Sequence, residues 1–374
     1  MEALNNSKIS LITILVLVFL VGCSSSTPIA SALPVPTTAV SQDIAMDKVT
    51  AVRVASPDSG WVGGNGWLAK TVNGGKEWKI QFTGKGTIHQ IYALDNQQAW
   101  ASIEEDMSLL STTDGGLTWL KSSSVPKLGF LHFVTTNEGY SANEKTNDGG
   151  KTWTKLHVPA GIVGDAYFHD KNHGWAVTQT KDAFQVERTV DGGKTWKTVM
   201  TRKVESELNA IIRSAGMNDA WIELIGDSGM TQTSYSVFHT TDGGSHWQTV
   251  IANSTAGGGP APGFPSSYTD GPNNKGNSPG PLYVVDPKTA FMGGQCMACD
   301  MPNSVGWTHD GGKSWVNGKQ RFTGFSAELL AMANEQQGWL ITTDSIKPSV
   351  LYSTANGGVK WDKVYTFAVP KKAE

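Results

Sequence analysis

Cysteine, arginine and long apolar stretches are all scarce in this sequence of 374 residues. It contains 3 cysteines and five arginines, and its net charge is −3 with 17% charged residues. Such a chain lacks the basic surface with which proteins bind nucleic acid or acidic lipid headgroups. Its longest apolar stretch is shorter than the roughly 20 residues that span a bilayer, and no long segment carries the period of an amphipathic helix. These absences argue against a nucleic-acid partner, a bundle of membrane-spanning helices and an all-helical domain.

The first 47 residues differ in composition from the rest of the chain. Lys8 precedes an apolar run over residues 9–21, which has the length of a signal-peptide core. The Leu-Val-Gly-Cys segment ending at Cys23 resembles the lipobox of bacterial lipoproteins, which implies cleavage before this cysteine and its acylation; an ordinary signal peptide or a membrane helix are the alternatives. We therefore expect a lipoprotein signal peptide over residues 1–22, a lipidated flexible tether rich in Ser, Thr and Pro over 23–47, and an extracytoplasmic protein held to the membrane by its lipid.

One eight-residue pattern, Thr-x-Asp-Gly-Gly-x-x-Trp, occurs seven times with small variations. Successive copies start 41, 34, 43, 51, 68 and 46 residues apart, and their mean of about 47 lies in the range of propeller blades. The Asp or Asn positions are Asn73, Asp114, Asp148, Asp191, Asp242, Asp310 and Asn356, and the Trp positions are Trp78, Trp119, Trp153, Trp196, Trp247, Trp315 and Trp361.

A second recurring feature, a small residue followed by an aromatic one, precedes each copy, as in Gly60-Trp61 and Ala220-Trp221. The Asp-Gly-Gly turn offers an acceptor for local N–H groups and residues that tolerate positive φ, which tight hairpins need. Each unit is then a small antiparallel sheet that cannot bury both faces alone, and closure into a ring buries them against neighbours. The sequence predicts an all-β fold, a seven-bladed antiparallel β-propeller over residues 48–374.

These motifs carry a resemblance that covers residues 48–365. The turn resembles the Asp-box (BNR) repeat of sialidases and sortilin-type receptors, and the fuller pattern is similar to the photosystem II stability/assembly-factor propellers and their relatives in non-photosynthetic bacteria. The resemblance implies a propeller that works as a binding or assembly module. It says little about chemistry, because the repeated residues build blades.

Two repeats depart from the pattern. In the third, six residues separate Tyr140 from Thr146, so we expect this blade to lack a full middle hairpin. Between the fifth and sixth turns the interval is longest, and the excess fits a Gly/Pro/Ser-rich insertion over residues 254–281 on one face of the propeller. Loops of this length are commonly either functional or disordered.

No convincing catalytic set appears in the sequence, and no cofactor or metal is expected. Seven Asp or Asn residues in a ring of turns invite a metal site, but each is expected to cap its own hairpin, far from the others. A sialidase needs three arginines that converge on a carboxylate, and only five arginines are available in the chain. The sequence leaves open a pair of catalytic acids of the kind that other glycosidases use, since any two acids at the mouth of the channel would supply it.

The pair Cys296-Met-Ala-Cys299 stands apart from the repeats. Outside the cytoplasm such a pair is a disulfide that closes a small loop, a redox-active dithiol or half of a soft-metal site. No second cysteine pair completes a zinc site, and the nearby Met292, Met297 and Met301 would suit Cu(I) or simply pack. Of these three interpretations of the cysteine pair, we favour the disulfide.

A set of channel residues follows from aligning the repeats on their small-aromatic pairs. Eight residues before each aromatic, on the expected innermost strand, stand Arg53, Tyr92, His132, Tyr167, Arg213 and Tyr283, with Ala331 in the seventh repeat. Their sequence neighbours are mainly apolar, so strand alternation places this set on the other face. We expect the six polar and aromatic side chains to line the central channel as a ring suited to a peptide or an acidic group. The alternative is that they pack between blades with their polar ends satisfied locally.

The function that these features favour is an exported, membrane-anchored lipoprotein whose propeller is a non-catalytic binding or assembly module for a protein partner. The alternative is a cell-surface propeller that binds or hydrolyses carbohydrate. A glycan binder needs an exposed aromatic strip, for which Trp67 and Trp307, the two tryptophans outside the repeats, are the natural choice. A third reading is a structural envelope lipoprotein with no small ligand.

Overall fold

The computed structural model describes residues 44–269 and 271–370, which all fall in one compact unit spanning residues 34–374. The predicted signal peptide, the lipid-attachment residue Cys23 and nearly all of the tether lie outside the described residues, so they stay predictions. The described residues contain β-strands and no α-helix, as an all-β propeller requires. In this part of the chain there is accordingly no helix with the length and apolarity to cross a membrane.

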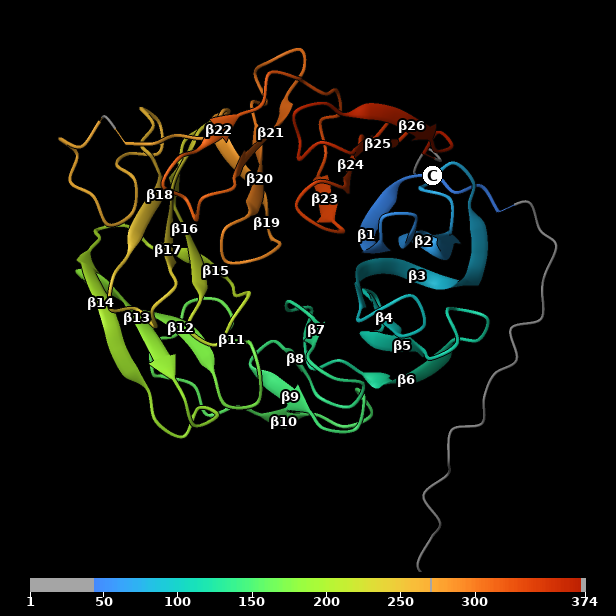
Figure 1. Cartoon of the computed structure of the whole chain (residues 1–374), viewed down its shortest axis with the longest axis horizontal. Coiled ribbons are helices and arrows are strands. Elements are labelled where there is room, and N and C mark those ends of the chain that lie inside the picture. The colour runs from blue at the N-terminus through green and yellow to red at the C-terminus, as the bar shows by residue number, and fades with distance from the viewer. Residues whose placement is uncertain (1–43, 270, 371–374) are drawn as a thin grey trace, which may run out of the picture. The chain divides into compact units, whose positions relative to one another are not determined.

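The strands form six antiparallel sheets that follow one another around a common centre (Figure 1). The first sheet has six strands: β1 (Val49–Ser56), β2 (Ser59–Thr71), β3 (Lys79–Ala93), β4 (Ala99–Ile103), β5 (Ser108–Thr112) and β6 (Leu120–Ser124). The second has β7 (His132–Phe133), β8 (Gly139–Ser141), β9 (Glu144–Thr146) and β10 (Thr154–Lys155). The third has β11 (Tyr167–Phe168), β12 (Gly174–Gln179), β13 (Ala183–Thr189) and β14 (Lys197–Lys203).

The remaining three sheets each have four strands. The fourth has β15 (Asn209–Arg213), β16 (Ala220–Ser228), β17 (Thr233–Thr240) and β18 (Gln248–Asn253). The fifth has β19 (Ser278–Val284), β20 (Ala290–Gln295), β21 (Asn303–Thr308) and β22 (Val316–Asn317). The sixth has β23 (Glu328–Met332), β24 (Gly338–Thr342), β25 (Val350–Thr354) and β26 (Asp362–Thr366).

The prediction of seven blades was wrong, because the described residues form six. The reason lies in β3, a strand of 15 residues that serves two repeats. Its first part pairs with β2, from Lys79 to Thr87, and its last part pairs with β4, from Ile88 to Ala93. The first and second repeats therefore share one continuous sheet, which carries two of the seven Asp-box turns.

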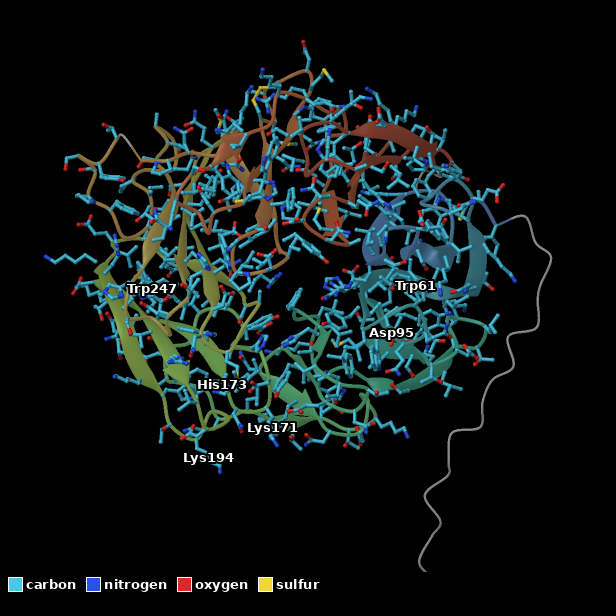
Figure 2. All side chains as sticks on the ribbon, viewed as in Figure 1. Trp61, Asp95, Lys171, His173, Lys194 and Trp247 are labelled. Atoms are coloured by element: carbon cyan, nitrogen blue, oxygen red, sulfur yellow. A yellow bond between two sulfur atoms is a disulfide. The ribbon has the colours of Figure 1, made fainter. Side chains whose placement is uncertain are left out.

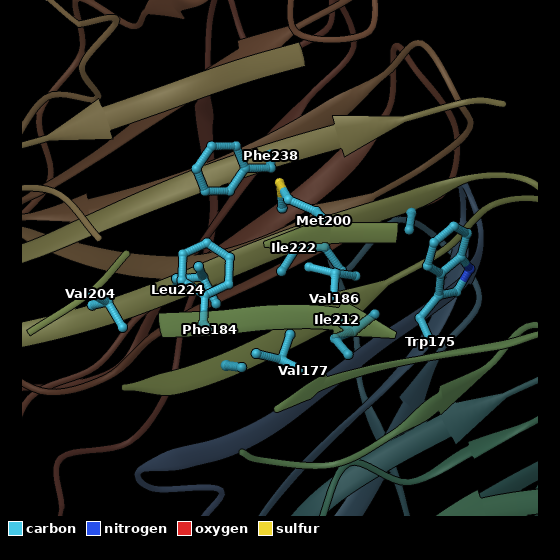
Figure 3. Packing of buried hydrophobic residues seen from close by; sticks show 12 residues of the cluster. Trp175, Val177, Phe184, Val186, Met200, Val204, Ile212, Ile222, Leu224 and Phe238 are labelled. Atoms are coloured by element: carbon cyan, nitrogen blue, oxygen red, sulfur yellow. The ribbon is translucent and has the colours of Figure 1, made fainter. Parts of the chain in front are cut away.

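Large apolar side chains between neighbouring sheets form the core. In the best-developed cluster, Trp175, Phe184 and Val186 of the third sheet pack against Ile222 and Phe238 of the fourth (Figure 3). The aromatic residues of the small-aromatic pairs are buried here and in the equivalent clusters. This burial explains why the small-aromatic pair occurs in every repeat. Each sheet removes its apolar face from water by packing against its neighbour.

The first and last sheets meet through both packing and hydrogen bonds. Val54 and Trp67 of the first sheet share an apolar cluster with Trp339 of the sixth and with Phe367, which follows β26. The N–H of Ala368 donates to the carbonyl of Met46 at 2.8 Å. Each end of the chain completes its own sheet, and the contact between these two sheets closes the propeller.

The two irregular repeats both have defined structure. The third keeps a middle hairpin of two three-residue strands, joined by Ala142 and Asn143, whose φ angles of 50° and 62° suit a tight turn. The insertion after β18 folds back onto the fourth sheet, where Phe264 stacks on Phe238 with ring centroids 5.7 Å apart. The Ser236 hydroxyl donates to the carbonyl of Pro262 there at 2.7 Å.

Candidate functional site: the central channel

The seven Asp-box turns share one pattern of hydrogen bonds, which the fourth illustrates. The Thr189 hydroxyl donates to Asp191 Oδ1 at 2.8 Å and accepts the N–H of Gly193 at 2.9 Å, while the N–H of Thr195 also donates to Asp191 Oδ1. The two glycines of every box have φ between 65° and 92°, a region open to glycine without strain. Lys194, in the same box, points into solvent (Figure 2).

These bonds occupy the acidic side chains of the boxes. Hydrogen bonds from Thr195 hold the pKa of Asp191 at about 2. The first glycine of each box also donates its N–H to a carbonyl in the turn between the first two strands of its repeat, as Gly115 does to Gln97 at 2.9 Å. Among the described residues, no group of three or more His, Cys, Asp or Glu is arranged to hold a metal ion.

The innermost strands place the predicted channel residues at equivalent positions. In each repeat the residue eight positions before the aromatic is its direct partner in the antiparallel ladder, as Arg53 is of Trp61 and Arg213 of Trp221. The same pairing holds for Tyr92, His132, Tyr167, Tyr283 and Ala331. The innermost strands β1, β3, β7, β11, β15, β19 and β23 face the common centre (Figure 1).

The structure brings the polar and aromatic members of this set into mutual contact. The Arg53 guanidinium lies over the Tyr92 ring, 4.4 Å from its centroid. The His132 and Tyr167 rings stack in parallel with centroids 4.5 Å apart, and Tyr92 approaches His132 at 6.4 Å. We call these six residues, Arg53, Tyr92, His132, Tyr167, Arg213 and Tyr283, the channel ring.

The channel ring holds two guanidinium groups that form no ion pair with any described residue. Neither Arg53 nor Arg213 belongs to any of the ion pairs among the described residues. Arg213 Nη1 donates to the carbonyl of Ile212 at 2.8 Å, and Arg53 Nη2 to that of Ala93 at 3.4 Å. Burial lowers the pKa of Arg213, but a guanidinium keeps its proton in proteins. The channel therefore carries half-buried positive charge.

His132 adds no charge to the ring at neutral pH. Its Nε2 lies 2.8 Å from the carbonyl of Phe168, so this nitrogen carries the proton and donates. Burial, together with the charges of Arg213 and Arg53, lowers the pKa of His132 to about 4. Burial likewise raises the pKa of Tyr167 to about 12, so its hydroxyl stays a neutral hydrogen-bonding group.

The channel ring separates two cavities. One, of about 420 Å³, is lined by His132, Tyr167 and Arg213 and by residues that precede them in the chain. The other, of about 250 Å³, is lined by Arg53 and Tyr283 and by residues that follow them in the chain. Each cavity therefore offers one of the two guanidinium groups to a ligand that enters from its side.

The larger cavity contains two residues that the sequence analysis missed. The Phe130 ring lies under the Arg213 guanidinium at 3.6 Å, and Asp165 accepts a hydrogen bond from the Phe130 N–H at 3.3 Å. Burial raises the pKa of Asp165. Both residues stand two positions before a member of the channel ring, so strand alternation applied one step further would have found them.

The remaining predicted site residues lie away from the channel. Cys296 and Cys299 are joined by a disulfide between β20 and β21. Trp67 and Trp307, considered for an exposed glycan-binding strip, are 0% and 6% exposed. Trp67 stacks on Phe367 and donates its indole N–H to Asp47, so the expectation of an exposed aromatic surface there was wrong.

Comparisons with known proteins show which folds this chain resembles. The family model described as photosynthesis system II assembly factor YCF48 matches residues 145–263. YCF48 from Cyanidioschyzon merolae is 15% identical, with 84% of this chain and 94% of that chain covered and a TM-score of 0.51. A structure of YCF48 bound to D1 peptide is 16% identical, with 84% and 92% covered and a TM-score of 0.49.

Enzymes share the fold as well. The GH74 xyloglucanase of Xanthomonas campestris is 14% identical with a TM-score of 0.56, and the match covers 84% of this chain but 52% of that enzyme. The present chain thus spans about half the length of the xyloglucanase. At these identities the likeness shows the fold alone. The search of curated proteins returned no match.

Proposed function

We propose a function for this chain on the premise that it is a β-propeller with BNR repeats, which the YCF48 family model matches over residues 145–263. The proposal is that the propeller is a non-catalytic binding module, which holds an acidic segment of a protein partner in its central channel. The family description, an assembly factor, supports a binding role. The sequence adds the further expectation that the module works outside the cytoplasm, held to a membrane by lipid on Cys23.

The observation that carries the proposal is a pair of half-buried guanidinium groups in the channel ring that belong to no ion pair among the described residues. Removing a charge from water is unfavourable unless another charge or hydrogen bonds compensate for it. Arg53 lies against an aromatic ring and one backbone carbonyl. Arg213 has an aromatic ring and one backbone carbonyl as well, and the carboxyl groups of Asp165 and Glu223 lie near it without forming an ion pair. A carboxylate supplies both the missing charge and a planar acceptor that matches a guanidinium.

The shape of the site favours an extended segment over a compact ligand. The two cavities lie on opposite sides of the channel ring, and each exposes one arginine. The surrounding Tyr92, His132 and Tyr167 offer flat faces and polar edges, which bind side chains and backbone amides of a peptide without large losses of conformational entropy.

Hydrolysis of a carbohydrate has less support. Glycosidases with the common mechanism use two carboxylates that flank the bond to be cleaved. Among the described residues that line the two cavities, Asp165 is the one acid. The two tryptophans that a glycan surface would use are buried.

A peptide-binding measurement tests the proposal. Fluorescent peptides of equal length, one acidic, one neutral and one basic, are titrated with the propeller at low and high salt. We expect the acidic peptide to bind at least about tenfold more tightly than the others, with an affinity that falls as salt rises. The double substitution Arg53→Gln and Arg213→Gln should abolish this preference, while Arg321→Gln, outside the channel, should preserve it. An acidic preference that survives the double substitution in a folded protein would refute the channel site.

A further inference from the structure

The hairpin that joins β20 and β21 ends in a disulfide. Cys296 follows β20 directly, and its sulfur is bonded to that of Cys299. This hairpin is unrelated to the Asp-box turns and to the channel ring. The bridge encloses two residues, Met297 and Ala298, so it constrains a short piece of chain.

The hairpin is fixed below the bridge by other interactions. The N–H of Cys296 donates to the carbonyl of Pro302 at 2.8 Å, which continues the ladder of β20 and β21. The buried side chain of Asn303 donates to the carbonyls of Thr323 at 3.1 Å and Gly324 at 2.7 Å. Since the loop-closure contribution of a disulfide is smallest for the shortest loops, this bridge adds little to a hairpin that is already held.

The two sulfur atoms of the bridge have different surroundings. Cys299 is exposed, whereas Cys296 is half-buried. The side-chain amide of Asn277 donates to the sulfur of Cys296, with the nitrogen 3.8 Å from it. An incoming thiolate thus reaches Cys299 more easily, and a thiolate that forms on Cys296 has a hydrogen-bond donor waiting.

The surface around the bridge favours a particular class of reductant. Met297, inside the disulfide loop, and Met301, two residues after Cys299, are 44% and 45% exposed, and Asp300, which follows Cys299 directly, is also exposed. Exposed methionines are adaptable apolar contacts. The carboxylate of Asp300, next to Cys299, repels an anionic thiol such as glutathione.

We propose that the Cys296–Cys299 disulfide is a redox-exchange site, which a dithiol protein with an apolar surface reduces and a disulfide partner restores. The thiolate of the dithiol attacks Cys299 Sγ and forms a mixed disulfide, and the electron pair of the broken bond leaves on Cys296. The second thiol of the reductant then attacks its own sulfur in the mixed disulfide and releases Cys299 as a thiolate. The chain gains two electrons, the reductant becomes a disulfide, and two protons complete the Cys296 and Cys299 thiols.

Chemical reduction of the folded protein tests the proposal first. The full chain is incubated with dithiothreitol or with glutathione, quenched with acid, alkylated and weighed by mass spectrometry. We expect dithiothreitol to reduce the bridge under native conditions, at least about tenfold faster than glutathione at equal thiolate concentration, with little change in the thermal midpoint. Reduction that occurs only after unfolding would overturn the proposal.

The direction of attack is tested by trapping. A neutral monothiol probe, the methyl ester of N-acetylcysteine, forms mixed disulfides that peptide mapping assigns to one sulfur. The adduct is expected on Cys299 in an excess of about tenfold, and equal labelling of both cysteines would contradict the assignment of leaving group.

Asn277→Ala tests the role of the amide. Loss of the donor should slow reduction by dithiothreitol and raise the pKa of the Cys296 thiol in the reduced protein. The matched control is Asn317→Ala, which removes an amide that binds the backbone of Asn273 on the same insertion without touching a sulfur. An Asn277→Ala protein that reacts at the wild-type rate, with the control also unchanged, would show that Cys296 is no special leaving group.

Discussion

Glu223 is a carboxyl group in the middle of β16 that is fully buried, and neither of its oxygens has a hydrogen-bond partner among the described residues. Burial raises the pKa of Glu223 to about 8, and the nearby charge of Arg213 only partly opposes this shift. At neutral pH the residue is therefore mostly protonated in the folded state. Arg213 consequently keeps its charge available inside the channel.

The stability of the protein should depend on this proton. The carboxyl of Glu223 titrates at about 4.5 in the unfolded chain and at about 8 in the folded one, so the unfolded state loses the proton first. Its contribution to stability is complete below pH 4.5 and is lost as the pH rises toward 8. Glu223→Gln should therefore gain a few kcal/mol relative to the wild type between pH 5 and pH 8, on the order of the shift itself. Urea unfolding at both pH values measures this gain, with exposed Glu205→Gln as the control; parallel pH profiles would contradict it.

His132 should give the opposite pH dependence. Its pKa falls from about 6.5 to about 4 on folding, because the folded state keeps the buried ring neutral. This contribution is complete above pH 6.5 and is lost as the pH falls toward 4. His132→Asn should flatten the acid side of the stability profile, and exposed His89→Asn should leave it unchanged. Thermal midpoints measured from pH 4 to pH 7 decide between these outcomes.

At the scale of secondary-structure elements, the threonine hydroxyl of each Asp-box makes the hydrogen bonds that hold the turn together. We expect Thr189→Val to lower the free energy of unfolding by about 1–3 kcal/mol, because it removes three hydrogen bonds and leaves the buried N–H of Gly193 without an acceptor. Thr195→Val, in the same turn, removes an exposed bond to Asp191, which water replaces, so its loss should stay below about 1 kcal/mol. Equal losses in the two variants, from urea unfolding, would rule out this division of roles.

The pairing of the strands was only partly predictable from the sequence. The register of the innermost strands was predictable, because the interval between each channel residue and its aromatic partner repeats through Arg53, Tyr167 and Arg213 alike. The continuity of β3 was not, because its two halves belong to different repeats and nothing in a repeat pattern says that one strand serves both. The count of blades failed for that reason.

At the scale of the whole molecule, the propeller depends on the contact between its first and last sheets. Phe367 is buried there and lies against Trp67 and Trp78. Phe367→Ala should lower the free energy of unfolding by about 3–5 kcal/mol, because a cavity opens where the two ends of the chain meet. Val369→Ala, exposed two residues on, should change it by less than about 0.5 kcal/mol. A small effect of Phe367→Ala on the urea midpoint would mean that closure does not rest on this cluster.

The channel itself was only partly predictable from the sequence. Alternation along the innermost strands gave the members of the channel ring, but it could not give their partners across the channel, which belong to strands far apart in the sequence. The stacking of His132 on Tyr167 and the placement of Phe130 under Arg213 depend on how the sheets pack. The burial of Glu223 could not be predicted from the sequence, because an acid in a strand ordinarily faces water.

Cross-linking of the tagged full-length chain in intact cells, followed by mass spectrometry, tests directly whether the channel holds a protein partner. We expect one stoichiometric protein partner, lost from the Arg53→Gln, Arg213→Gln double variant and kept by Arg321→Gln. Capture of the same partner by the double variant at the wild-type level, or retention of glycan fragments with no protein partner, would contradict this expectation.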